Sequence, residues 1–230
     1  MYIQDVRKRK VIPTMPNWVM NELTCIFQTK EEYNAFKNKV DEENFYNSFF
    51  PMPEILQGTQ CPNVNVDKLI LEYNQATNSK AMGLTEIIKA NHSWFSRTAE
   101  QALKNQQAYI ETGYYEWYKW CLDNWGVKWD ASNVQSKELH DFNTIIYNFD
   151  SPWGCPEHFV IELSKLYPDA CFEMVSGSIE NDTHYEFTCV DGKFEETCSY
   201  ETFREAVEDG KWGGMEEWAE LFEESEEIDS

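Results

Sequence analysis

The stretch Trp18-Val-Met-Asn-Glu-Leu-Thr-Cys-Ile-Phe27 carries the strongest indication of the fold. Apolar residues occupy both its odd and its even positions, so both faces of a strand formed here would be apolar. This pattern is typical of a central strand. Thr29 and Glu32 come directly after it and form a T-x-x-E capping box, which predicts a helix over about 30–43. The apolar face of that helix would consist of Tyr33, Phe36 and Val40.

The next segment predicts a helical insertion. The two prolines in Phe49-Phe-Pro-Met-Pro53 are incompatible with a helix or a central strand, so an ordered loop is expected there. From about Val66 to Asn124 the chain is rich in helix formers and amides, with apolar residues at helical spacing. The longest candidate helix runs from Ser96 to about Leu122. We therefore expect an insertion of helices over about 66–124.

The C-terminal half returns to extended segments. Strands are predicted at 127–131, 143–149, 170–179, 183–190 and 193–197, with a hairpin turn at Asp191-Gly192. Pro156 and Pro168 bound a predicted amphipathic helix, and Gly210 ends a shorter one that begins near residue 199. Strands and helices do not alternate regularly, so an α+β sandwich is preferred over a doubly wound sheet.

The composition indicates a globular protein of the cytoplasm. The 230 residues are 42% hydrophobic and 15% aromatic, enough for a substantial core. No apolar run approaches the roughly 18 residues of a membrane span, and no apolar segment follows the first ten residues as a secretory signal would require. The seven scattered cysteines are expected to be reduced thiols packed as small hydrophobes.

Charge is the second strong feature of the chain. The net charge of −22 and the pI near 4.4 disfavour direct nucleic-acid binding and favour attraction to basic surfaces. Residues 195–230 hold fourteen acidic side chains against Arg204 and Lys211, a net charge of −12. We predict a single domain over 1–210 that carries the insertion, followed by an acidic helix or tail over 211–230.

The terminal segment 215–227 combines this charge with an apolar stripe. Met215, Trp218, Ala219 and Phe222 fall at i, i+3, i+4 and i+7, so a helix formed here would be sharply amphipathic. Its acids would lie ~2.6 Å apart in a helix, near the spacing of DNA phosphates, but about 5.7 Å apart in an extended chain. Mimicry of DNA therefore requires the helix. The residues expected to contact a partner are Glu216, Glu217, Trp218, Glu220, Phe222, Glu223, Glu224 and Glu227.

Two other interpretations of this segment remain open. The stripe would pack on the protein's own core if the tryptophan and phenylalanine are withdrawn from water. Alternatively, the segment is a disordered tail, because glutamates in the last turn oppose the helix dipole.

An aromatic cluster at the end of the insertion is a second candidate site. The cluster could line a pocket that stacks a nucleobase, or it could dock the insertion on the sheet. The second interpretation is favoured, because lysines are the only cations nearby in sequence and no arginine is available for a phosphate. The cluster comprises Tyr114, Trp117, Tyr118, Trp120, Trp125 and Trp129.

No motif of catalysis or metal binding reaches the strength of these two features. Cys155-Pro-Glu-His158 has the spacing of half a zinc site, which His184 and Cys189 would complete, but no paired C-x-x-C is present. A nucleophile elbow, a phosphate loop and an H-E-x-x-H motif are all missing. We therefore nominate no catalytic residue, no metal ligand and no cofactor.

Three stretches carry a resemblance to a known family. They are Met15-Pro-Asn-Trp-Val-Met-Asn-Glu-Leu-Thr24, Asn124-Trp-Gly-Val-Lys-Trp-Asp-Ala131, and Tyr147-Asn-Phe-Asp-Ser-Pro-Trp-Gly-Cys-Pro156 with the following Leu163-Ser-Lys-Leu-Tyr-Pro168. Over about 15–175 the chain resembles the Api-ninety-two-like proteins of phages and plasmids. The resemblance implies a ferredoxin-like domain, an antiparallel sheet with helices on one face, and a viral origin. It implies no activity and no site residue, and it leaves 179–230 unexplained.

These features together predict a binding protein rather than an enzyme. We expect a phage-type acidic protein in the host cytoplasm that inhibits a host protein by occupying its basic surface, acting as a DNA mimic. A nucleic-acid-binding protein of bacterial defence is the expected kind of partner, and neither direct nucleic-acid binding nor membrane binding is expected. The alternative function is a protein that sequesters or cleaves a nucleotide with the aromatic cluster.

Overall fold

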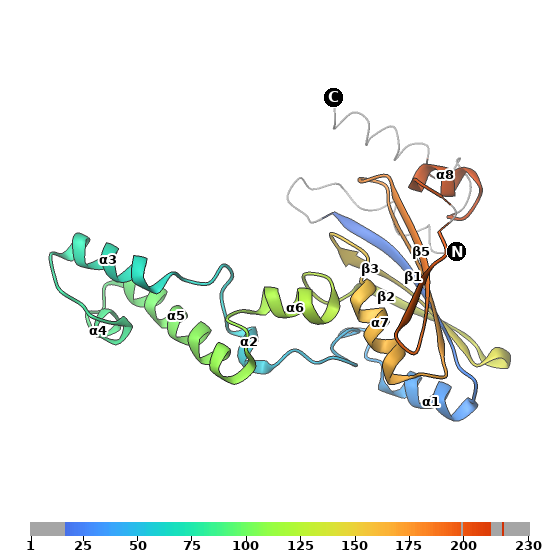
Figure 1. Ribbon diagram of the computed structural model, residues 1–230, viewed down its shortest axis with the longest axis horizontal. Coiled ribbons are helices and arrows are strands. Elements are labelled where there is room, and N and C mark those ends of the chain that lie inside the picture. Colours follow the sequence, from blue (N-terminus) through green and yellow to red (C-terminus); the bar gives the residue numbers. More distant parts are fainter. Residues whose placement is uncertain (1–16, 199, 213–217, 219–230) are drawn as a thin grey trace. The chain divides into compact units, whose positions relative to one another are not determined.

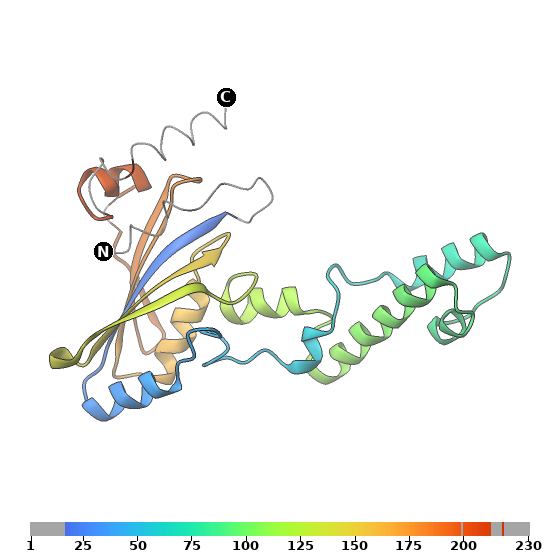
Figure 2. The same cartoon turned by 180° about the vertical axis from the view of Figure 1, so that it is seen from behind.

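The computed structural model describes residues 17–198, 200–212 and 218. The chain divides into two compact units. One, the sheet unit, comprises Met1–Phe50 and Trp125–Ser230, and the other, the helical unit, comprises Pro51–Asn124. Figure 1 and Figure 2 show the elements of both units from opposite sides.

A six-stranded antiparallel sheet forms the first unit, which confirms the α+β class. The strands are β1 (Trp18–Ile26), β2 (Ser132–Leu139), β3 (Thr144–Pro152), β4 (Cys171–Ser178), β5 (Thr183–Val190) and β6 (Lys193–Glu196). Their order across the sheet is β2-β3-β1-β4-β5-β6. β1 pairs with β3 on one side, where Leu23 lies opposite Tyr147, and with β4 on the other, where Leu23 lies opposite Met174. The prediction that β1 is a central strand is therefore confirmed.

The strand predicted at 127–131 is wrong, because β2 begins only at Ser132. β2 is an edge strand whose side chains are mostly polar and of which none is buried, so it lacks the apolar alternation that marks a half-buried strand. Its register with β3 also shifts between Ser132 and Gln135. The buried Val127, which suggested the earlier strand, instead enters the core from an irregular segment.

Two helices, α1 (Lys30–Lys39) and α7 (Glu157–Leu166), cover one face of the sheet (Figure 1). The N-cap half of the predicted capping box is present, because Oγ1 of Thr29 accepts from the backbone N–H of Glu32 at 3.2 Å. The Glu32 carboxylate accepts from the Thr29 hydroxyl at 3.1 Å rather than from its backbone N–H. α1 ends at Lys39, earlier than the predicted residue 43. A short 3-10 helix, η2 (His140–Phe142), connects β2 to β3.

The core beneath these helices is aromatic. Phe36 of α1 lies 4.9 Å from Phe27 and 4.9 Å from Phe49 between ring centroids, and 6.2 Å from Phe172 of β4. Residues far apart in sequence therefore share one cluster, whose large flat rings bury much apolar area per residue. Other fully buried members are Tyr33, Phe45, Tyr46, Tyr147, Phe149, Phe159 and Phe187.

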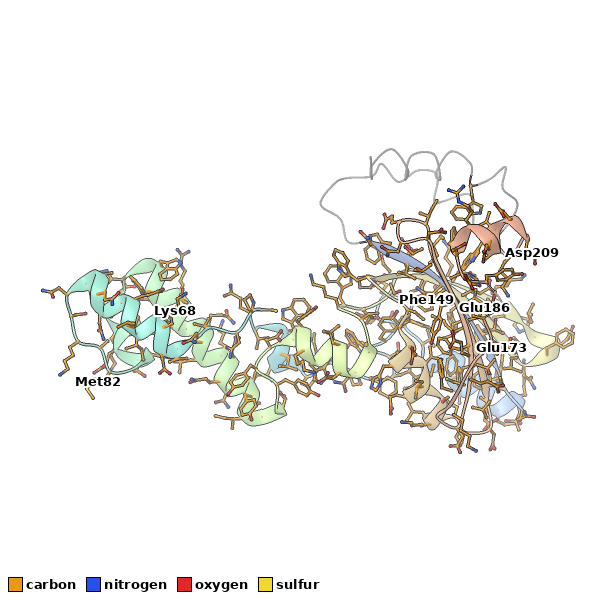
Figure 3. The ribbon with its side chains drawn as sticks, turned by 45° about the horizontal axis from the view of Figure 1, so that its top comes forward. Lys68, Met82, Phe149, Glu173, Glu186 and Asp209 are labelled. Carbon is orange, nitrogen blue, oxygen red and sulfur yellow. The ribbon has the colours of Figure 1, made fainter. Side chains whose placement is uncertain are left out.

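The opposite face of the sheet carries a smaller helix, α8 (Phe203–Glu208), in addition to the two helices of the first face. Met20 projects from this face and packs with Phe203, Val207 and Trp218. Gly177 faces the same cluster, where a Cβ atom would lie 2.5 Å from a ring carbon of Phe203. Glycine at this position therefore allows α8 to approach the sheet. Figure 3 labels Glu173 and Glu186, whose strand positions place them on this face as well.

The second unit consists of helices. They are α2 (Glu54–Gln57), α3 (Val66–Thr77), α4 (Leu84–Lys89), α5 (Ser93–Thr112) and α6 (Trp117–Trp125), the last of which ends in the sheet unit. α3, α4 and α5 bury a core of Leu69, Tyr73, Ala81, Leu84, Ile87, Ala99 and Ala102. In the part of the chain that the structure describes, no helix has both the length and the apolar character needed to cross a membrane.

The single helix predicted from Ser96 to about Leu122 is two helices. Gly113 adopts a left-handed conformation with φ of 81°, and its N–H donates to Tyr109 O at 2.8 Å, which ends α5. α6 then starts beside Glu116, whose carboxylate accepts from the N–H groups of Tyr118 and Lys119. A glycine C-cap followed by an acidic N-terminal cap therefore divides the apolar periodicity.

Candidate functional site

The acidic terminal segment is described at one position only. Glu216, Glu217, Glu220, Phe222, Glu223, Glu224 and Glu227 lie outside the described residues. Trp218 is 2% exposed, its ring centroid lies 5.2 Å from that of Phe203, and its Nε1–H donates to Trp212 O at 2.9 Å. This indole is covered by the protein's own side chains. For Trp218, packing on the protein's own core describes the structure better than contact with a partner.

Trp212, which holds Trp218, is itself tied to the sheet through His184. The indole Nε1–H of Trp212 donates to Nδ1 of His184 at 3.0 Å, and Nε2 of His184 lies 2.8 Å from the Glu186 carboxylate. An indole N–H can only donate, so Nδ1 is the acceptor and Nε2 carries the proton given to Glu186. His184 is thus a neutral connector between β5 and the residues after α8. In the zinc site weighed from the spacing of Cys155 and His158, His184 would instead have been a metal ligand.

Glu186 also pairs with Lys211, at 3.0 Å. Burial would raise the pKa of Glu186, but the hydrogen bonds from His184 and Lys211 outweigh it and lower that pKa. The carboxylate therefore stays ionised and binds both His184 and Lys211, which lie more than twenty positions apart in the chain.

Exposed carboxylates occur at both ends of β5, on β6 and on or beside α8. The part of β5, β6 and α8 between 182 and 209, which we call the acidic rim, exposes Asp182, Asp191, Glu195, Glu196, Glu201, Glu205, Glu208 and Asp209. Its cations are Lys193 and the half-buried Arg204. β6 is an edge strand, and α8 lies beside β5 (Figure 1). The acidic rim carries eight exposed carboxylates against two cations, and it includes both faces of the sheet edge, because Glu195 lies opposite Thr188 and Glu196 opposite Phe187.

A groove of about 820 Å³ lies in the helical unit. Three segments meet there, namely the start of α2, the end of α5 and the middle of α6. Thr59 connects two of them, because its Oγ1 accepts from Trp117 N at 3.0 Å and donates to Leu56 O at 2.6 Å. The lining residues are Pro53, Glu54, Ile55, Glu111, Thr112 and Trp120.

A buried amide fixes the third segment. Asn105 of α5 is fully buried, its Nδ2 donates to Gln60 O at 2.8 Å, and its Oδ1 accepts from Gln60 N at 3.2 Å. Gln101, one turn earlier, donates to Gly58 O at 3.1 Å. The end of α2 is therefore hydrogen-bonded along α5, and the walls of the groove are held by side-chain contacts rather than by chain connectivity.

The predicted aromatic cluster is divided between the two units. Tyr114, Trp117, Tyr118 and Trp120 belong to the helical unit, and among these Trp120 lines the groove. Trp125 and Trp129 belong to the sheet unit. Trp125 is buried and its Nε1–H donates to Phe50 O at 3.0 Å, whereas Trp129 lies 6.3 Å from Trp18 between ring centroids.

Sequence reasoning missed the two carboxylates of the groove, Glu54 and Glu111. They are more than fifty residues apart, and neither lies in a recognisable motif. The available signal was Glu111, an acidic residue in the last turn of α5, where the helix has no basic residue. It points to an unbalanced negative end.

Other titratable groups are tied into the structure. Burial raises the pKa of the Cys155 thiol to about 12, so the thiol is protonated and is no nucleophile at neutral pH. Tyr33 donates to Glu138 at 2.6 Å, and burial followed by this hydrogen bond raises the pKa of Tyr33 to about 12. Within residues 17–198, 200–212 and 218, no three histidine, cysteine, aspartate or glutamate side chains are placed to hold a metal ion.

Comparisons with known proteins find similarity to a solved structure. No protein-family model and no curated protein matches the chain. The chain is similar to the crystal structure of protein api92 from Yersinia pseudotuberculosis, described with the family model DUF1281. The two share 9% sequence identity with a TM-score of 0.42, and the match covers 81% of this chain and 99% of that one.

Proposed function

We propose that this protein is an acidic binding protein that occupies a basic surface of a partner protein. The observation that carries the proposal is the division of charge between the two units. The sheet unit has a net charge of −20 and the helical unit only −2. A field concentrated in one unit attracts cationic surfaces and speeds their association.

The acidic rim supplies the contact surface in this proposal. Its eight exposed carboxylates lie on a short edge strand, at the two ends of β5 and on or directly beside α8. The connection from Trp212 through His184 to Glu186 holds the residues after α8 to β5. Carboxylates carried on a supported surface lose less entropy on binding than those on a free tail. The terminal residues 219–230 would add to the same charge.

We also infer that the first four strands form a ferredoxin-like domain. The chain order β1-α1-β2-β3-α7-β4 and the spatial order β2-β3-β1-β4 support this, since both follow the split βαβ arrangement. β5, β6 and α8 would then be an addition at one edge. The acidic rim lies mostly on this addition, so fold and binding surface would be separate parts of the unit.

The partner we propose is a nucleic-acid-binding protein of a host, because such proteins display basic surfaces. Carboxylates would take the place of phosphates and block the surface sterically. Inhibition of bacterial defence by a phage protein is one setting for this mechanism. Imitation of DNA by residues 215–227 is part of the proposal only if they form a helix.

The test begins with capture of partners from a bacterial lysate at low and high salt, followed by affinity measurements on each purified partner. Glu195→Lys with Glu196→Lys reverses two charges of the acidic rim. Glu31→Lys with Glu43→Lys makes the same change in net charge at exposed positions on and after α1. We expect the rim variant to weaken binding about tenfold or more and the control to have a smaller effect.

Two results would contradict the proposal. One is a partner whose affinity does not change with salt, because a charge-driven contact must weaken as screening increases. The other is equal weakening by the rim variant and the control, which would assign the effect to net charge rather than to this surface.

A further inference from the structure

We propose that the groove of the helical unit binds an organic cation, namely an ammonium or guanidinium group on an apolar stem. The inference uses no residue of the sheet unit and is independent of the proposed function. It depends on the charge, the helix end and the aromatic wall that meet in the groove.

The charge of the groove is negative and unbalanced. Glu54 and Glu111 line it, and no lysine or arginine does. Glu111 accepts a hydrogen bond from Gln107 at 2.5 Å, but neither glutamate forms an ion pair with a described residue. The nearest lysine along α6, Lys119, is paired with Asp123. The groove therefore offers two carboxylates to an incoming cation.

The end of α5 adds to this potential. α5 is 20 residues long and has no basic residue in its last turn, so the negative end of its dipole is not compensated there. Thr112 lines the groove from this end, and its hydroxyl is already used by Ala108 O at 2.7 Å. A cation in the groove would take the place that a lysine or arginine occupies at many helix C-termini.

The rest of the lining is apolar. Pro53 and Ile55 form one wall and Trp120 another. Trp120 is 7% exposed, so only part of its indole is presented to the groove. An aliphatic stem would pack on these side chains, and a cationic head would gain from the ring as well as from the carboxylates. A volume of about 820 Å³ lies in the range of small-ligand sites.

The same lining disfavours two other ligands. A nucleotide would bring phosphates beside Glu54 and Glu111, where like charges repel. A divalent metal ion prefers six or more oxygen ligands, and among the described residues no group of three candidate side chains is placed to hold one. An organic cation needs fewer charged contacts because its stem is bound by apolar surface.

The experiment uses the full chain and follows the indole N–H signal of Trp120 by ¹⁵N nuclear magnetic resonance. The probes are spermidine, an N-acetylated trilysine amide, and adenosine monophosphate as the anionic control. The groove variant carries Glu54→Gln and Glu111→Gln, which keep side-chain shape. The matched control carries Glu72→Gln and Glu100→Gln, on α3 and α5 of the same unit but outside the groove.

We expect at least one cation to shift the Trp120 signal in a saturable way. The groove variant should weaken that binding about tenfold or more, and the control by less than twofold. A response to spermidine alone supports a polyamine ligand, and a response to the peptide supports a basic side chain of a protein. The inference is overturned if neither cation shifts Trp120, if both variants weaken binding equally, or if adenosine monophosphate binds there more tightly.

Failure here is distinguishable from failure of the proposed function. Glu54→Gln with Glu111→Gln leaves the acidic rim unchanged, and Glu195→Lys with Glu196→Lys leaves the groove unchanged. If partner binding does not depend on salt but the Trp120 signal still responds to a cation, the proposed function is contradicted and the groove inference stands. If partner binding depends on salt but the Trp120 signal does not respond, the groove inference is contradicted and the proposed function stands.

Discussion

The sheet unit and the helical unit are stabilised in different ways. In the sheet unit, rings from residues as distant as Phe27, Phe36 and Phe172 form one buried cluster. The helical unit has a smaller, mostly aliphatic core and relies on amide side chains such as Asn105 to join its segments. The stability of the sheet unit depends on buried apolar area, and that of the helical unit depends also on a few side-chain hydrogen bonds. Removal of a single side chain should therefore lower stability for different reasons in the two units, by leaving a cavity in the sheet unit and by breaking hydrogen bonds in the helical unit.

The surfaces of the two units also differ, in charge and in exposed apolar side chains. The sheet unit carries almost all of the net charge. Among the residues that the structure describes, the nearly neutral helical unit exposes more large apolar side chains than the sheet unit. Those of the helical unit are Leu71, Met82, Trp94, Leu103, Tyr109, Ile110 and Tyr115. Met82, at 81% exposed, is labelled in Figure 3. Charge acts over about a Debye length and apolar contact only at touching distance, so the units are suited to different steps of recognition.

The comparison is tested most strongly by Phe36→Ala. We expect a loss of about 4 kcal/mol from the sheet unit, because the ring is fully buried among other rings and its removal leaves a cavity. Hydrogen exchange measured by mass spectrometry should show weaker protection in β1 and unchanged protection in α5. Phe142→Ala is the control, since Phe142 is 73% exposed, and it should cost less than about 0.5 kcal/mol. Equal loss in α5 would show that the two units unfold together.

Asn105→Ala tests the helical unit in the same way. Removal of the buried amide breaks its two hydrogen bonds to the backbone of Gln60, at about 1 kcal/mol each, which should cost about 2 kcal/mol. Protection should fall in α2 and α5 and stay unchanged in β1. Gln106→Ala, at the next and exposed position of the same helix, is the control. If Asn105→Ala were as mild as this control, the hydrogen-bonded links would not be what holds α2 to α5.

The smallest expected effect concerns Tyr33 and pH. Tyr33→Phe should lower the stability of the sheet unit by about 1 kcal/mol at pH 8, because the hydrogen bond to Glu138 is lost. The folded-state pKa of Tyr33 is raised from 10.0 to about 12, so its contribution is present below pH 10 and is lost as the pH rises towards 12. Urea denaturation of both proteins at pH 8 and pH 11 should show the difference shrinking. A constant difference would mean that the phenol is not stabilised in its neutral form.

Local signals in the sequence were sufficient for several elements. Apolar residues on both faces predicted β1, the capping box predicted the start of α1, and Asp191-Gly192 predicted the β5–β6 turn, where φ is 50° and 71°. Each signal depends on residues only a few positions apart. β2 was misplaced because an exposed edge strand has no apolar pattern, and α5 was extended too far because Gly113 interrupts a continuing periodicity.

The candidate sites divide along the same line. Net charge and its concentration towards the C-terminus are properties of composition, so they follow from the residues whatever the fold. Three features depend on contacts between residues far apart in the chain, and no local pattern encodes which distant segments meet. These are the burial of Trp218 on Phe203, the neutral bridge of His184 between Trp212 and Glu186, and the meeting of Glu54 with Glu111 beside Trp120. They follow from the packing of whole elements, in which burial of apolar surface brings together side chains that the sequence keeps apart.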